Sequence, residues 1–241
     1  MFEPGDRVLL VGSGRTFFVR AGTGSFSTDR GVLDLDALLQ ASPGDTVLTH
    51  TGSEFRVLSP RAPDFFARAS RSGAPMLPKD IGLVTAYTGM NRNDRVLDAG
   101  TGSGICAIYF GGIASTVETW EIRPEFAKSA EKNIADAKLS NVQVVCGDVM
   151  DATGPYDVVH LDLHVTPEIV RHAWSVLIHG GYLACYTPFL EQLFTVMDTA
   201  AGLFSEVAAH ECIGREMARG SRGTRPSTRV CHSGYVTVAR K

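Results

Sequence analysis

The ten residues RVLDAGTGSG, at positions 95–104, constrain the fold of this chain more than any other stretch. The apolar segment from Arg95 to Ala99 has the composition of a buried strand and runs into three glycines at alternate positions. A strand that ends in a glycine-rich turn and continues into a helix commonly cradles a nucleotide-like ligand, because glycine permits the tight turn and lets a ligand approach the backbone. We therefore expect a ligand site at residues 100–104.

The spacing of these glycines differs from two common nucleotide motifs. The dinucleotide fingerprint is GxGxxG, whereas the order here is GxGxG and Ile105 stands where the third glycine of the fingerprint would fall. The Walker A motif is not matched either, since no Gly-Lys-Ser/Thr follows. Glu121 ends the next predicted strand, 17 residues beyond Gly104. A carboxylate at that position can accept hydrogen bonds from both hydroxyls of a ribose.

Strand and helix patterns alternate from residue 94 onward. Apolar strands are predicted at 95–99, 117–121, 142–146, 157–161 and 181–186, followed by two closing strands at 207–212 and 230–239. Helices are predicted at 103–110, 124–137, 167–177 and 190–203. Continuous apolar strands separated by helices predict an α/β fold with a mostly parallel sheet that is covered on both faces.

The chain divides into three segments on its sequence pattern. Residues 1–59 contain short β-type runs with glycine turns, which predict a small β-barrel-like domain. Residues 60–93 begin with PRAP and form a linker, with Asp64 as a helix cap and a second helix over 80–88. Residues 94–241 form the α/β domain that holds the ligand site.

The charge of the chain excludes a general nucleic-acid coat protein. The formal net charge is −3 and the pI is about 6.2, so any nucleic acid must be bound by a local basic patch. One such patch is predicted in residues 213–230, where a mobile loop holds one acid, Glu216, and five arginines: Arg215, Arg219, Arg222, Arg225 and Arg229. Arginine pairs with phosphate in bidentate fashion. A charged loop that is merely solvated is the alternative.

The cysteines and the terminal composition indicate the compartment. The five cysteines form no CxxC pair and no zinc-ligand spacing, so we expect buried thiols in a reducing cytosol and no metal site. The first residues carry no secretory signal pattern, and no apolar run has membrane-spanning length. A cytoplasmic protein is the expectation.

Residues 94–162 resemble the class I methyltransferases, which bind S-adenosylmethionine (SAM). DAGTGSG is similar to their first motif, WEIRPEF to their second, and Gly147-Asp148 lies after the third strand, where such enzymes commonly contact the adenine. The resemblance implies a Rossmann-like seven-stranded sheet and SAM as cofactor. It also implies a set of cofactor-binding residues, namely Gly100, Gly102, Ser103, Gly104, Ile105, Glu121, Phe126, Asp148 and Asp162.

A narrower resemblance covers nearly the whole chain. RVLDAGTGSG, WEIRPEF, the LDL of 161–163 and the HSGYVTVARK of 232–241 together resemble the tRNA (adenine-N1)-methyltransferases, which modify an adenosine in the TΨC loop at tRNA position 58. FSTDRGVLDLDALL, PGDTV and the PKD of 78–80 match further elements of that family. The resemblance implies tRNA as substrate, a homotetramer, and a catalytic aspartate at Asp162. The substrate side would then include Arg215, Arg219, Arg222, Arg225 and His232.

Asp162 ends an apolar strand at the carboxyl edge of the sheet, where open α/β sheets place their sites. A carboxylate that accepts a hydrogen bond from the adenine N6 amino group would align N1 with the methyl carbon, so its contribution is positioning and electrostatics.

Each of these residues also has a structural alternative. Asp162 could cap the following helix, Phe126 could belong to the core, and Asp148 could be a turn residue. His232 could support the fold rather than contact substrate. His160 and His164 flank Asp162 at even spacing, and we expect a structural role for them rather than a metal site.

The chain departs from the family pattern at two places. Leu77 stands before PKD where an aromatic residue is common, and Leu163 to Pro167 replaces a Leu-Pro-aromatic segment. The resemblance implies that both changes fall where the target base would be bound. The alternatives to a tRNA methyltransferase are a class I methyltransferase acting on a protein or small molecule, and a non-catalytic tRNA-binding subunit. The intact Gly102, Gly104 and Glu121 argue against the second.

Overall fold

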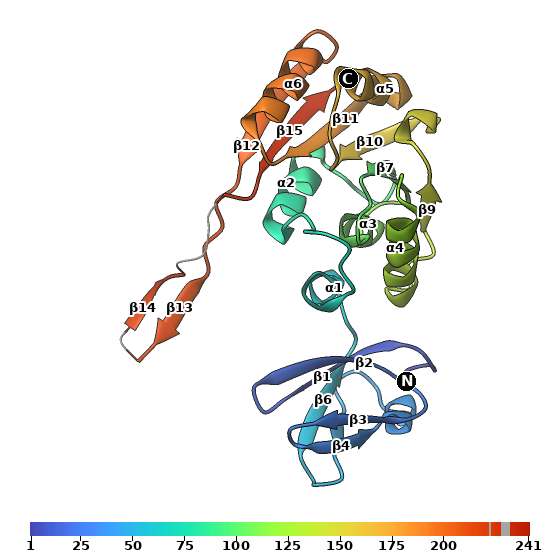
Figure 1. Ribbon diagram of the computed structural model, residues 1–241, viewed down its shortest axis with the longest axis vertical. Helices are drawn as coiled ribbons and strands as arrows, with labels where there is room; N and C mark the ends of the chain where they lie inside the picture. Colours follow the sequence, from blue (N-terminus) through green and yellow to red (C-terminus); the bar gives the residue numbers. More distant parts are fainter. Residues whose placement is uncertain (222, 228–231) are drawn as a thin grey trace. The chain divides into compact units, whose positions relative to one another are not determined.

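The computed structural model describes residues 1–221, 223–227 and 232–241 (Figure 1). The chain forms two compact units, Met1–Ala69 with Asp136–Lys138, and Ser70–Ala135 with Leu139–Lys241. Helix α1 (Ala62–Arg68) therefore goes with the first unit, while residues 70–93 go with the second. Asp64 is not the cap residue of α1, because the helix begins at Ala62, and its carboxylate accepts a hydrogen bond from the Arg61 N–H at 2.9 Å.

The first unit consists of antiparallel strands around one core. Strands β1 (Arg7–Gly12), β2 (Arg15–Arg20), β5 (Thr46–Leu48) and β6 (Glu54–Leu58) form a sheet in the order β2-β1-β6-β5. Strands β3 (Ser25–Thr28) and β4 (Gly31–Asp34) form a hairpin, and a 3₁₀ helix spans Leu35–Gln40. The His50 N–H donates to the Val32 carbonyl at 2.9 Å and joins the hairpin to the segment after β5, which gives a barrel-like arrangement.

The second unit is built on one seven-stranded sheet. Its strands are β7 (Arg95–Ala99), β8 (Thr116–Glu121), β9 (Val142–Cys146), β10 (Tyr156–Leu161), β11 (Leu177–Thr187), β12 (Glu206–Glu211) and β15 (Tyr235–Arg240). The order is β12-β15-β11-β10-β7-β8-β9, and only β15 runs antiparallel to its neighbours. This confirms the predicted mostly parallel sheet of a class I methyltransferase fold.

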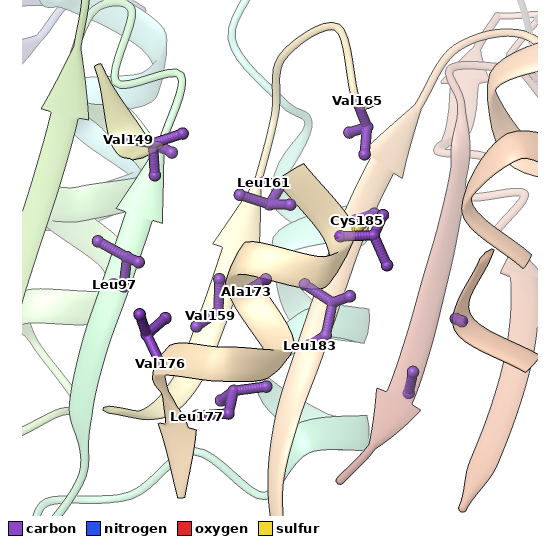
Figure 2. Close-up of a cluster of buried hydrophobic side chains, with 14 of the residues drawn as sticks. Leu97, Val149, Val159, Leu161, Val165, Ala173, Val176, Leu177, Leu183 and Cys185 are labelled. Carbon is purple, nitrogen blue, oxygen red and sulfur yellow. The ribbon is translucent and has the colours of Figure 1, made fainter. Parts of the chain in front are cut away.

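Helices cover both faces of this sheet. Side chains alternate between faces along β10, so Val159 and Leu161 point one way and His160 the other. Figure 2 shows Val159 and Leu161 in a core with Leu97, Leu183 and residues of α5 (Pro167–Val176). Helix α6 (Leu190–Ala201) adds Val196 and Ala200 to this cluster.

The opposite face carries α2 (Pro78–Thr88) and α3 (Ile105–Gly111), and the ring of Phe110 in α3 meets His160 edge-on, with centroids 5.1 Å apart. Helix α4 (Pro124–Asp136) follows β8, and a 3₁₀ helix spans Val149–Asp151. No helix in the described ranges is long and apolar enough to cross a membrane.

The arginine-bearing segment differs from the expected loop. Strands β13 (Met217–Gly220) and β14 (Gly223–Pro226) pair as a short antiparallel hairpin whose described residues are exposed (Figure 1). The two strands are joined by backbone pairing with each other. An exposed polar sequence gives no pattern from which this pairing could be predicted. The predicted closing strand at 230–239 is shorter, since β15 begins at Tyr235, and residues 230 and 231 lie outside the described part.

Candidate active site

The candidate site lies where the strand order of the sheet reverses, between β7 and β10. The Asp162 N–H, just after β10, donates to the Ala99 carbonyl of β7 at 2.8 Å. Gly100 follows β7 with φ of +88°, and a Cβ at this position would lie 1.9 Å from the Asp162 carbonyl oxygen. The glycine loop and the aspartate are therefore in direct backbone contact, at the crevice where open α/β sheets bind ligands.

The other two glycines of the loop have different roles. Gly104 has φ of +78°, and a Cβ there would lie 3.2 Å from the Cβ of Ala130, so this glycine lets α3 begin close against α4. Gly102 has φ of +54°, and a Cβ there would meet only the Gly100 carbonyl, at 3.8 Å. Open space above Gly102 is what a loop that receives a ligand requires.

Glu121, at the end of β8, faces the loop as expected. It is 3% exposed, and its Oε2 accepts a hydrogen bond from the Gly102 N–H at 3.0 Å. Burial raises the pKa of this carboxyl, but hydrogen bonds from Arg123 and from the Gly102 N–H outweigh burial and lower the pKa below its ordinary value. The site therefore keeps Glu121 ionised.

Arg123 holds the same carboxylate from the solvent side. Its Nε donates to Glu121 Oε1 at 2.8 Å, its Nη2 to Oε2 at 3.2 Å, and its backbone N–H to Oε1 at 3.1 Å. With the Gly102 N–H, these bonds fill the roughly four lone-pair positions of a carboxylate. The guanidinium also lies 3.7 Å from the ring centre of Phe126, a cation–π contact.

Two cavities open at this edge of the sheet. The larger, of about 480 Å³, lies toward the Gly147 side, and the smaller, of about 260 Å³, lies under the segment Ser72–Met76. Gly100, Arg123 and Asp162 line both. The larger volume is within the range of small-molecule sites. The arrangement suits an extended ligand whose two ends occupy different cavities.

Asp162 is the carboxylate that lines both cavities. Burial raises the pKa of its carboxyl to about 6, the nearby Asp98 carboxylate adds to this, and His160 opposes it. A carboxylate with such a pKa is an effective hydrogen-bond acceptor at neutral pH and is protonated in mild acid. Strongly shifted groups in a cleft mark functional sites.

A buried polar network lies behind the loop. His160 Nδ1 is 2.6 Å from Asp98 Oδ1, the Thr119 hydroxyl donates to Asp98 Oδ2 at 2.6 Å, and Thr101 Oγ1 is 2.6 Å from Thr119 Oγ1. These contacts tie the glycine loop to β8 and β10. His160 is thus buried in the fold, whereas His164 is exposed, with Nδ1 3.1 Å from Gln192 Nε2.

The other expected cofactor residues lie at the two cavities in different ways. Ser103 and Ile105 are buried at the smaller cavity, and Ser103 Oγ accepts from the Ser72 N–H at 3.2 Å, which holds the segment above the loop. Phe126 lines the same smaller cavity. Asp148 lines the larger cavity, but its carboxylate also accepts from the Met150 N–H at 2.9 Å as the cap of the following 3₁₀ helix.

Sequence reasoning missed three contributors to the site. Arg123 and Ile122 both lie within WEIRPEF, and Ile122 is 66% exposed beside the larger cavity, an unusual state for an isoleucine. Their position next to Glu121 was the available signal. Met76 lines the smaller cavity, and its sulfur is 4.0 Å from the Cys106 sulfur. No cluster of three His, Cys, Asp or Glu residues suited to a metal ion occurs in the described ranges.

The expected substrate residues fall at two places. Arg219 and Arg225 lie on β13 and β14 and are exposed, Arg215 precedes the hairpin, and Arg222 lies outside the described residues. His232 has its Nδ1 2.7 Å from Glu211 Oε1 and its Nε2 3.2 Å from the Pro188 carbonyl oxygen. Both partners are acceptors, and the Glu211 hydrogen bond raises the pKa of His232. The imidazole therefore links the residues just after the arginine-bearing segment 213–230 to Glu211 and Pro188.

Known proteins resemble the chain across both units. The family model described as protein-L-isoaspartate(D-aspartate) O-methyltransferase matches residues 72–211, which belong to the second unit except for Asp136–Lys138. The tRNA (adenine(57)-N(1)/adenine(58)-N(1))-methyltransferase TrmI of Methanocaldococcus jannaschii is 31% identical and aligns over 97% of this chain and 94% of its own. At that coverage the alignment extends into Met1–Ala69, which the family model does not reach.

Two solved structures also match over the full length. A SAM-dependent O-methyltransferase from Thermotoga maritima superposes with a TM-score of 0.86 at 26% identity, over 100% of this chain and 94% of its own. The tRNA (m1A58) methyltransferase TrmI from Aquifex aeolicus superposes with a TM-score of 0.81 at 25% identity, over 100% and 98%.

Proposed function

The chain belongs to the tRNA (adenine-N1)-methyltransferase family, and from this premise we propose that it methylates N1 of an adenosine in the TΨC loop of tRNA, at position 58 or its neighbour. The observation that carries the proposal is the place of Asp162, in contact with the glycine loop and lining both cavities. A methyl donor beside the loop and a base beside the carboxylate would then meet at one point. The protein is an enzyme on this view, with SAM as methyl donor.

The residues at the two cavities fit SAM. At the larger cavity, Glu121 offers an ionised carboxylate for ribose hydroxyls and Ile122 offers an exposed apolar surface for the adenine. At the smaller cavity, Gly102 leaves open space. Asp148 lies at the larger cavity as a further polar contact. SAM supplies a methyl group on a sulfonium, which leaves as a neutral thioether.

The chain's own contribution to the chemistry is positioning and charge. The Asp162 carboxylate accepts a hydrogen bond from the N6 amino group of the adenine, which orients N1 toward the donor and raises the electron density of the ring. The product is a cationic base, and the same carboxylate stabilises that charge. The base must leave its stack to reach Asp162.

The tRNA would be held by the arginine-bearing segment. Arg219 and Arg225 are exposed on a hairpin of a chain that is otherwise slightly acidic, and Arg215 and Arg222 lie in the same segment. Arginine side chains suit backbone phosphates.

We further propose a homotetramer in the cytoplasm. The exposed apolar residues Phe189, Leu190 and Phe194, at 63%, 45% and 55%, support a contact between subunits. Light scattering on the purified protein tests the mass.

A methyl-transfer assay tests the proposed function. The protein is incubated with labelled SAM and an unmodified tRNA transcript, and the product is digested to nucleosides. We expect labelled 1-methyladenosine, which disappears with Asp162→Ala and with a transcript whose position-58 adenosine is replaced. Labelled SAM that binds without any labelled tRNA would contradict the substrate, and no SAM binding would favour a non-catalytic tRNA-binding subunit.

A second candidate is methylation of a protein carboxylate, which the family-model match over residues 72–211 favours. The same assay distinguishes it when an isoaspartyl peptide replaces the tRNA, because a methyl ester is labile to base and releases labelled methanol. We expect no such release. The arginine-bearing segment and Met1–Ala69 both lie outside the match, and both argue for tRNA.

A further inference from the structure

The connection between β12 and β15 carries the arginines, and both of its ends contact Lys79 and Asp80 of α2. The contact is packing at the start of the connection and hydrogen bonding at its end. At its start, Gly214 packs on Lys79, since a Cβ on Gly214 would lie 3.2 Å from the lysine Cδ. At its end, the Lys79 ammonium donates to the Ser233 hydroxyl at 2.6 Å, and that hydroxyl donates to Asp80 Oδ2 at 2.7 Å. One lysine therefore contacts both ends of the segment.

The pair itself is rigid. Asp80 is fully buried, and its Oδ1 accepts from the Lys79 ammonium at 2.6 Å. A buried carboxylate is stable only when it is paired and hydrogen-bonded, and here both oxygens have a partner. The lysine side chain is 18% exposed and uses two of its three donors within the protein. Lys79 is therefore poorly placed to bind phosphate itself.

Other contacts fix the same base of the segment. The Tyr186 hydroxyl donates to the Ser233 carbonyl at 2.7 Å, and a Cβ on Gly234 would collide with the tyrosine ring at 2.5 Å. His232 is held between Glu211 and the Pro188 carbonyl, as described above. Among the described residues, β13 and β14 pair only with each other. The contacts given above join the two ends of the segment to the domain.

We infer that Lys79 and Asp80 are positioning residues for the RNA substrate, which act by holding Ser233 and Gly214 so that the arginine hairpin meets the tRNA backbone. This inference rests on the proposed tRNA substrate. Lys79 and Asp80, of the PKD motif, would then place the tRNA indirectly, through the arginine-bearing segment that they contact. They would not touch the target base themselves. Misplaced arginines would weaken tRNA binding without affecting the SAM site.

Ser233→Ala is the variant that tests this placement. It removes both hydroxyl hydrogen bonds to the segment while it leaves the Lys79–Asp80 ion pair intact, so the buried charge stays compensated although Asp80 Oδ2 loses its hydrogen bond. The matched control is Ser205→Ala, which removes the hydrogen bond from the Ser205 hydroxyl to the Arg240 carbonyl. Ser205 lies just before the start of β12, whereas the arginine-bearing connection leaves from the other end of that strand, after Glu211.

We expect the tRNA Kd and KM of Ser233→Ala to rise about threefold to tenfold, the scale of one or two lost hydrogen bonds, with kcat and the SAM Kd unchanged. In a double-mutant cycle, Ser233→Ala should weaken tRNA binding less in the Arg219→Ala/Arg225→Ala background than in the wild type, because two of the arginines that depend on placement are then absent. Ser205→Ala should bind tRNA like the wild type. Thermal melts confirm that each variant is folded.

Three outcomes would overturn the inference: additive losses in the cycle, an unchanged tRNA Kd, or an equal loss in Ser205→Ala. These outcomes are distinct from failure of the proposed function, because that failure shows in the wild type as tRNA that stays unmethylated. Lys79→Met/Asp80→Asn, which removes both charges of the pair together, should reproduce the Ser233→Ala effect on tRNA with the same unchanged SAM Kd.

Discussion

Gly100 and the carbonyl oxygen of Asp162 are so close that a Cβ on residue 100 would lie 1.9 Å from that oxygen. Gly100→Ala must therefore separate the glycine loop from the segment after β10, and its φ of +88° adds strain. We expect a loss of about 2 to 4 kcal/mol in the free energy of unfolding and more than about tenfold in SAM affinity. Urea unfolding and calorimetric titration measure the two.

Gly89→Ala is the matched control for this variant. Gly89 has φ of +65° at the end of α2, but a Cβ there meets nothing within 4 Å. It should cost about 1 to 2 kcal/mol, from the left-handed backbone alone, and leave SAM affinity unchanged. Equal stability of the two variants would show that the contact with Asp162 does not constrain residue 100.

The sheet was predictable from sequence because its strands contain apolar runs that alternate with helical patterns along the chain. The ends of the strands were less predictable. Strand β11 begins at Leu177 rather than at 181, since Leu177 pairs with Tyr156 of β10 across an irregularity in the ladder. Nothing in the residues 177–180, where Gly180 follows His179, predicts that pairing. The β13–β14 hairpin was missed for a related reason, because its exposed strands lack an apolar alternation.

The site was predictable where a motif stands in one stretch of sequence. The glycine loop and Glu121 belong to such stretches, and the structure brings them into hydrogen-bond contact. The Asp98–His160 pair was not predicted, because it depends on β7 and β10 lying side by side with these two residues in register. The position of Arg123 depends on a side-chain rotamer that folds back on Glu121, which local pattern does not encode.

Arg123 is predicted to compete with SAM for Glu121. The carboxylate already accepts four hydrogen bonds, two of them from the guanidinium, which is 51% exposed and can leave. Ribose hydroxyls must displace these two bonds, so Arg123→Ala should tighten SAM binding by about threefold to fivefold, the scale of one hydrogen bond. Glu121→Gln should weaken it. Isothermal titration with SAM shows whether the affinity of Arg123→Ala rises or falls. Weaker SAM binding in this variant would show that the guanidinium contacts the ligand instead.

Asp162→Asn is predicted to be inactive and more stable. Because the folded-state pKa of about 6 lies above the usual value of 3.8, folding disfavours the ionised form. The stability contributed by the protonated form is full below about pH 4 and is lost as pH rises through about 6. At pH 7.5 the variant should gain about 1 to 2 kcal/mol, less than the full shift because the side chain is partly exposed. Melts at pH 7.5 measure this.

The same carboxyl sets the pH dependence of the reaction. The ionised carboxylate only accepts hydrogen bonds, whereas the protonated carboxyl also carries a donor that the N6 amino group cannot match. The wild-type kcat/KM should therefore fall as pH drops below about 6. The control is Asp151→Asn, at an exposed aspartate at the end of the 3₁₀ helix Val149–Asp151. This variant should keep the fall of kcat/KM in acid and the stability of the wild type. A flat pH profile down to pH 5, or an asparagine variant less stable than the wild type, would contradict this assignment of Asp162.

Arg219→Ala/Arg225→Ala is predicted to weaken tRNA binding without affecting the methyl donor. Both side chains are exposed on the hairpin, and each phosphate contact contributes about 0.7 to 0.9 to the slope of log Kd against log salt. The slope should therefore decrease by about 1.4 to 1.8 while the SAM Kd stays constant. Arg171→Ala, an exposed arginine on α5 beside Glu168, controls for the loss of positive charge. An unchanged slope in the double variant would place the RNA elsewhere on the protein.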